Sequence, residues 1–237
     1  MCGRATVIDP NGIESRFYGF TRRLIPSDWK PRYNLNPREE IPVVHIDSES
    51  GDRVLSSMHW NFVPSHIGSS EQWTAFDSQY STFNAKIERV ATAPTFKGAW
   101  RRQRCLVVVD GMIEWVGPKG RKVPHWIRHG SHGPFAMAGL WSEWRGAGDE
   151  PPRRSCTIVI GPCDDWYSRF HHRMAVLLRP ALYDNWLDPD LTDSGQVRQL
   201  LDSTPFPMAE EMEAGPISRK VNNPGYDDPD GLCLVES

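Results

Sequence analysis

Residues 104–115 read RCLVVVDGMIEW, and this stretch indicates the kind of fold that the chain adopts. The apolar run from Cys105 to Val109 has the length of a strand and is rich in β-branched side chains. Asp110 and Gly111 then form a bend, which presents Glu114 next to Trp115. The segment therefore predicts a buried strand with a carboxylate beside an indole just after it.

Similar short apolar stretches, bounded by Gly, Pro or charge, recur along the chain at 41–46, 124–129, 134–141, 155–160 and 173–178. Residues 116–122 and 146–152 are typical of hairpin or surface loops. Helix-period segments are fewer: Asn11–Tyr18, Ala85–Ala91, Asp164–His171, Pro180–Leu187 and Thr192–Asp202. Many strands without β-α-β alternation predict a single α+β domain over residues 1–237, with a closed or highly bent sheet and peripheral helices.

The composition of the 237 residues is ordinary for a globular protein, with 39% hydrophobic and 24% charged residues. The chain lacks an apolar run of the ~20 residues that span a bilayer. It also lacks a basic-then-apolar signal segment, so we expect a cytoplasmic protein, or a nuclear one in a eukaryote. Residues 182–237 hold 12 of the 30 acidic but 3 of the 27 basic residues, leaving 24 basic against 18 acidic before them. We expect an acidic, turn-rich tail at about 204–237 that packs on a basic body able to bind a polyanion.

Five cysteines, an odd number without CxxC spacing, favour neither a disulfide framework nor a zinc site. Cys105 and Cys156 lie in apolar runs, whereas Cys2 directly follows the initiator methionine. Removal of Met1, which needs a small second residue, would expose an amine of pKa ~7.7–8.0 beside a thiol of pKa ~8.5. Such an aminothiol condenses with an aldehyde to an imine, and the thiolate then closes a five-membered thiazolidine. The N-terminus is therefore a candidate aldehyde trap.

Four later stretches contain polar side chains that could surround this reagent. In STFNAKIERV, Asn84 and Lys86 at the predicted helix start would favour an anion. Glu114 beside an indole in a dry pocket would have a raised pKa and could act as a general acid or base. In RFHHRMAVLL, His171 and Arg173 alternate as in a strand and would share a face.

The remaining stretches, PRYNLNP and MHWNFVP, add Asn34 as a polar contact and Trp60 as an aromatic wedge or stacking platform. Each of these residues has an ordinary structural explanation when taken alone. Asn84 could be a helix cap, Trp60 a core residue and Glu114 a surface carboxylate.

In combination and in this order, the motifs resemble the SOS-response-associated peptidase (SRAP) family. The matching stretches cover nearly the whole chain: MCGR, PRYNLNP, WNFVPS, FNAKIE, RCLVVVDGMIEW, AGLWSEW, FHHRM, WLDP and VNNPGYDDP. The resemblance implies a mixed, mainly β pseudo-barrel with peripheral helices. It also implies an activity without metal or cofactor: recognition of abasic sites in single-stranded DNA and covalent crosslinking to them, by a protein that we expect to be a monomer.

The resemblance also implies residue roles. Cys2 supplies the amine and the thiol, Asn84 orients the sugar or the amine, Glu114 assists sugar ring opening and proton transfer, and His171 is the family histidine. Among the predicted DNA contacts are three cations: Arg4, Lys86 and Arg173. The family name implies a peptidase activity, either removal of Met1 or self-release, and incision of the strand by a lyase-type elimination would be a side reaction.

Three positions depart from the usual family pattern: Lys86 replaces an arginine, Ile113 an aromatic residue and Ala175 a proline. The first removes bidentate phosphate recognition while keeping the charge. Two other functions stay open. One is an N-terminal-nucleophile amidohydrolase of the glutamine amidotransferase type, which would release ammonia from glutamine. The other is a non-covalent reader of modified bases, which would not need a free N-terminus.

Overall fold

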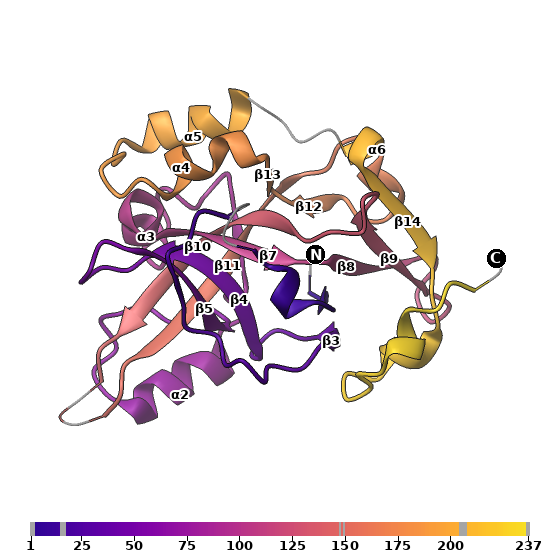
Figure 1. Ribbon diagram of the computed structural model, residues 1–237, viewed down its shortest axis with the longest axis horizontal. Coiled ribbons are helices and arrows are strands. Elements are labelled where there is room, and N and C mark those ends of the chain that lie inside the picture. The colour runs from indigo at the N-terminus through magenta and orange to yellow at the C-terminus, as the bar shows by residue number, and fades with distance from the viewer. Residues whose placement is uncertain (1–2, 15–17, 147, 149, 204–207, 236–237) are drawn as a thin grey trace.

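The computed structural model describes residues 3–14, 18–146, 148, 150–203 and 208–235. Two sheets dominate it (Figure 1). The smaller sheet has, in spatial order, strands β14 (Met212–Pro216), β9 (Val123–His129), β8 (Gly111–Val116), β1 (Ala5–Val7) and β3 (Arg32–Leu35). The larger follows the order β12 (Arg173–Ala175), β11 (Arg153–Pro162), β10 (Phe135–Trp144), β7 (Arg104–Val109), β4 (Glu40–Ile46), β5 (Arg53–Trp60) and β2 (Arg22–Arg23).

The larger sheet closes on itself. Strand β5 pairs in parallel with β11 at Ser155↔His59 and Cys156↔Trp60, so β11, β10, β7, β4 and β5 form a ring. Two short strands extend it: β13 (Leu177–Leu178) on β10 and β6 (Asn84–Lys86) on β11. The expectation of a mixed, mainly β pseudo-barrel within an α+β fold is confirmed.

Strand β7 carries apolar side chains on both of its faces, because other parts of the molecule cover both faces. Cys105, Val107 and Val109 belong to the core between the two sheets, whereas Leu106 and Val108 belong to a second core beneath the helices. All six residues of β7 are buried. A β-carbon on Gly139, in the neighbouring β10, would lie 2.7 Å from Val107 Cγ2, so this position requires glycine.

The helices lie around the periphery of the two sheets (Figure 1). In Figure 1, α4 (Tyr183–Leu187) and α5 (Ser194–Ser203) lie together at one edge and α2 (Ser70–Gln79) lies at the opposite edge. The other helices of the described residues are α3 (Lys97–Arg102) and α6 (Met208–Glu211), with 3-10 turns η1 (Pro10–Gly12), η2 (Tyr167–Arg169), η3 (Pro180–Leu182), η4 (Arg219–Asn222) and η5 (Pro229–Leu232). None of the described helices has the length and apolar character that crossing a membrane would require.

The strands predicted at 41–46, 104–115, 124–129, 134–141, 155–160 and 173–178 are confirmed, with β12 and β13 sharing the last stretch. The helices predicted at Pro180–Leu187 and Thr192–Asp202 correspond to η3 with α4 and to α5. The helix predicted at Ala85–Ala91 is wrong. Ala85 and Ile87 are both buried two residues apart, and pairing with β11 makes this segment extended before a turn.

Two further helix predictions are only partly met. The segment Asp164–His171 contains the single turn η2, and Asn11–Tyr18 contains the end of η1, with residues 15–17 outside the described part. The C-terminal segment does more than cover the surface, because β14 adds a strand to β9. Ile217, Val221 and Leu232 then bury a small third core against Ile113 and Trp126.

Candidate functional site

Glu114 is a buried residue of β8. It faces His125 of β9 in the ladder, and 4% of its surface is exposed. The hydroxyl of Tyr167 donates to its Oε1 at 3.2 Å. Burial raises the pKa of Glu114, because removing a carboxyl from water disfavours its charged form. A carboxyl whose pKa is raised holds its proton at a higher pH than an exposed one, which suits a general acid.

His171 follows η2 and precedes β12. Its Nδ1 accepts a hydrogen bond from the Arg173 amide at 3.0 Å, and its ring stacks on that of His172 with centroids 4.2 Å apart. Burial lowers the pKa of His171, and the neighbouring charges of His172 and Lys122 act in the same direction. The imidazole is therefore mostly neutral at physiological pH and able to accept a proton.

Three of the predicted residues flank one stretch of β11. Asn84 pairs with Ile158 and Lys86 with Ile160 on one side, while Arg173 of β12 faces Pro162 on the other. The Asn84 carboxamide oxygen is buried and Lys86 is exposed. Arg173 Nη1 contacts Glu88 Oε1 at 2.5 Å, an ion pair at the surface. Lys86 and Arg173 thus lie at the end of β11 that pairs with β12, the strand that follows His171.

Arg4 is fixed from two directions. Its Nη1 donates to Asn34 Oδ1 at 2.6 Å and to the Val221 carbonyl at 2.8 Å, and its guanidinium lies 5.3 Å from the ring centroid of Trp115. Trp115 in turn donates from Nε1 to Asn222 Oδ1 at 2.7 Å. The C-terminal segment therefore orients both the arginine and the indole.

A hollow of about 490 Å³ lies over this pair, lined by Arg4, Trp115, Lys119, Gly120, Lys122 and Asn222. The charge of Lys122, which lines the hollow, also lowers the pKa values of Glu114 and His171. We did not predict Lys119, Lys122 or Trp115 as site residues. Their signal in the sequence is the basic, glycine-containing loop VGPKGRK at 116–122, directly after the indole.

Asn34 and Trp60 have roles other than the predicted ones. Both side chains are completely buried, so neither contacts a DNA strand directly. Trp60 donates from Nε1 to the Phe83 carbonyl at 3.0 Å and belongs to the core between the sheets. Asn34 donates to the carbonyls of the C-terminal segment and accepts from Arg4. Asn34 thus acts on the surface through Arg4.

Met1 and Cys2 lie outside the described residues. The chain just after them leads into strand β1. The Arg4 carbonyl accepts from the Ile113 amide at 3.1 Å, and Ala5 pairs with Met112. Strand β1 therefore runs alongside the strand that carries Glu114. Within the described part of the chain, no group of three or more His, Cys, Asp or Glu side chains is arranged to hold a metal ion.

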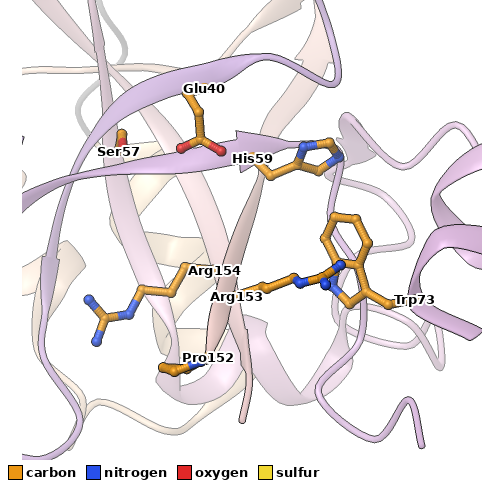
Figure 2. A pocket seen from close by; sticks show the side chains of 7 residues that line it. All are labelled: Glu40, Ser57, His59, Trp73, Pro152, Arg153 and Arg154. Atoms are coloured by element: carbon orange, nitrogen blue, oxygen red, sulfur yellow. The ribbon is translucent and has the colours of Figure 1, made fainter. Parts of the chain in front are cut away.

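A separate cavity of about 520 Å³ lies at the other end of β11, next to Arg153 and Arg154 (Figure 2). The Glu40 carboxyl points into it from β4, while the rings of His59 and Trp73 border its other side. The predicted site residues lie elsewhere in the described structure, so this cavity is distinct from the group around Glu114.

Comparison with known proteins identifies the family. The model of the family described as SOS response associated peptidase (SRAP) matches residues 1–224. The chain belongs to the SRAP family. Abasic site processing protein YoqW of Bacillus subtilis (strain 168) is 29% identical over 240 residues, which is 100% of both chains. Abasic site processing protein HMCES of Gallus gallus is 26% identical over 88% of this chain and 67% of its own length.

Solved structures agree with this fold. A crystal structure of a protein from Bacteroides thetaiotaomicron superposes with a TM-score of 0.80 at 20% identity, over 100% of both chains. A phage-related protein from Bordetella bronchiseptica superposes with a TM-score of 0.67 at 24% identity, over 92% of this chain and 95% of its own. The SRAP chain therefore shares its two-sheet architecture with distant relatives.

Proposed function

We propose that this SRAP protein processes abasic sites in single-stranded DNA by forming a thiazolidine crosslink through Cys2 after Met1 is removed. The observation that carries the proposal is the buried Glu114 carboxyl, held beside the strand that leads back to the N-terminus. The names of the relatives, abasic site processing proteins from a bacterium and a vertebrate, support the substrate.

The chemistry needs an aldehyde, an amine and a thiol. Opening of the abasic sugar gives the aldehyde, and the Cys2 amine adds to its carbon to form a carbinolamine. Loss of the hydroxyl as water leaves an imine, for which the Glu114 carboxyl supplies the proton. The thiolate then forms a C–S bond to the imine carbon, and the nitrogen takes up a proton as the ring closes. Asn84 and His171 orient the sugar and the reacting amine.

The DNA backbone follows the cations around this carboxyl. Arg4, Lys119 and Lys122 line the hollow beside Trp115, and Lys86 and Arg173 flank the end of β11. Phosphate contacts of this kind bind without regard to sequence, and they weaken as salt rises. The Trp115 indole offers a surface on which a flanking base stacks.

The family name suggests an accompanying peptidase step, and a lyase-type incision of the strand would follow if the imine eliminates before the ring closes. Release of Met1 by the protein itself would supply the free amine that the crosslink needs. We propose both as secondary activities, and we expect the protein to act in the cytoplasm, or in the nucleus of a eukaryotic host.

The test uses an oligonucleotide with one abasic site and a denaturing gel. Wild-type protein is expected to give a denaturation-resistant band that Cys2→Ala abolishes, whereas replacement of the exposed Cys233 by alanine leaves it unchanged. Cys2→Ser should retain an imine that borohydride traps but should not form the stable ring. A band that persists undiminished in Cys2→Ala would refute the proposal.

One further variant separates the alternatives. An extra glycine ahead of Cys2 removes the aminothiol, so crosslinking is expected to be lost while DNA binding remains. Binding of modified-base DNA with no crosslink in the wild type would favour the non-covalent reader. Release of ammonia from glutamine would favour the amidohydrolase.

A further inference from the structure

Tyr167 is a completely buried residue next to the candidate catalytic carboxyl. Its hydroxyl donates to Glu114 Oε1 at 3.2 Å, across 53 positions of the sequence. A carboxyl in a dry site needs such partners, because an unsatisfied polar atom in the interior is costly. The contact joins β8 to η2, two elements that share no backbone pairing in the described structure.

The backbone of the same residue supports His171. The Tyr167 carbonyl accepts from the Phe170 amide at 2.8 Å and from the His171 amide at 3.2 Å. The Tyr167 amide donates to Asp164 Oδ1 at 2.7 Å, which fixes the start of the turn. One residue thus holds Glu114 through its side chain and His171 through its main chain.

Aromatic rings enclose this arrangement. The Tyr167 and Phe170 rings meet edge to face with centroids 5.9 Å apart, and Phe170 also packs on Trp166 at 5.2 Å and on His125 at 5.8 Å. His125 is the residue opposite Glu114 in the β8–β9 ladder. Glu114 itself is 4% exposed, so the hydroxyl contact sets its orientation more strongly than it would at an exposed position.

We propose that Tyr167 is a positioning residue that fixes the Glu114 carboxyl and ties its orientation to that of His171. The inference rests on the proposed function, since it assigns Tyr167 to the reaction in which Glu114 transfers protons. A phenol suits this role because it donates to an ionised carboxylate and accepts from a protonated one, so the contact survives each proton transfer.

The hydroxyl also adjusts the acidity of Glu114. Burial raises the pKa of this carboxyl, and the hydrogen bond from Tyr167 opposes that effect by stabilising the ionised form. Removing the hydroxyl while keeping the ring should therefore raise the pKa of Glu114 further. The bond is stronger to the ionised carboxylate than to the protonated carboxyl, and a difference of about 1.4 kcal/mol between the two corresponds to about one pKa unit.

The test compares Tyr167→Phe with Tyr18→Phe, a matched removal of a buried hydroxyl. Tyr18 donates to the Pro134 carbonyl at 3.0 Å, away from the carboxyl. The readouts are the carbon-13 NMR titration of the Glu114 carboxyl, assigned with Glu114→Gln, and the pH profile of the crosslinking rate. Tyr167→Phe is expected to move both midpoints up by about one unit and Tyr18→Phe to move neither. If both midpoints of Tyr167→Phe coincide with those of the wild type, the proposal is overturned.

The NMR titration needs no DNA, so the two proposals fail separately. If wild-type protein forms no crosslink, the proposed function fails while the titration still reports on Tyr167. If Tyr167→Phe does not fold, 3-fluorotyrosine replaces the tyrosines, since the more acidic phenol donates more strongly with the same shape. The Glu114 midpoint is then expected to fall, and an unchanged midpoint would contradict the role of Tyr167.

Discussion

Replacing Asn34 by alanine should destabilise the protein strongly, because this polar side chain is completely buried and bonded. The carboxamide oxygen accepts from Arg4 at 2.6 Å. Its nitrogen lies within 3.2 Å of three carbonyls of the C-terminal segment, those of Val221, Asn223 and Tyr226. The side chain has 0% exposure, so water does not replace these partners.

The magnitude follows from the groups left without a partner. Two amide hydrogens serve the carbonyls and one oxygen serves a guanidinium, and each buried group that loses its partner costs about 1–3 kcal/mol. The sum for Asn34→Ala is about 4 kcal/mol, a large fraction of the ~5–15 kcal/mol by which domains are stable. Arg4 loses one of its two hydrogen bonds, so DNA affinity should fall as well.

Urea unfolding followed by tryptophan fluorescence measures this effect. Asn222→Ala is the matched control, because Asn222 lies in the same segment but is exposed and bonds to Trp115 alone among the described side-chain contacts. We expect the control to lose less than about 1 kcal/mol. An Asn34→Ala variant that also stays within about 1 kcal/mol of the wild type would refute the reasoning that this amide ties the C-terminal segment to β3.

Three other outcomes are expected. Burial raises the pKa of Asp110 to about 6, so its ionisation costs stability as pH rises from about 3 to 7. The free energy of unfolding of the wild type, relative to that of Asp110→Asn in urea unfolding, should therefore fall by about 3 kcal/mol over that range. Lys122→Ala should reduce the slope of log affinity against log salt for single-stranded DNA by about 0.7, measured by fluorescence anisotropy, whereas the exposed Lys97→Ala should not. Gly139→Ala should lower stability by about 1–3 kcal/mol, because its β-carbon overlaps Val107.

The barrel strands could be predicted because the apolar residues along each strand show which of its faces are buried. In β7 and β10 both faces are covered, and continuous apolar runs follow directly from that. Strand β6 was mistaken for a helix because Asn84 resembles a cap. The parallel pairing with Ile158 that makes it a strand comes from a segment more than seventy residues later.

The site was predicted unevenly for the same reason. Glu114 could be singled out because its carboxylate stands beside Trp115 shortly after an apolar run, and its burial in the structure agrees with that interpretation. The burial of Asn34 and the hydrogen-bond partner of the Trp60 indole could not be predicted. They depend on the tail at 221–226 and on the carbonyl of Phe83, both distant in sequence. The Tyr167 contact depends likewise on the closure of η2 over β8.

The central claim is that a processed N-terminal cysteine reacts with the abasic sugar, and intact-mass analysis tests it most directly. The protein is measured before and after incubation with single-stranded DNA that carries one abasic site. We predict a mass lacking Met1 before incubation, and afterwards a further mass equal to that chain plus the oligonucleotide minus one water. An unchanged protein mass after incubation, with Met1 absent and the DNA intact, would contradict the claim.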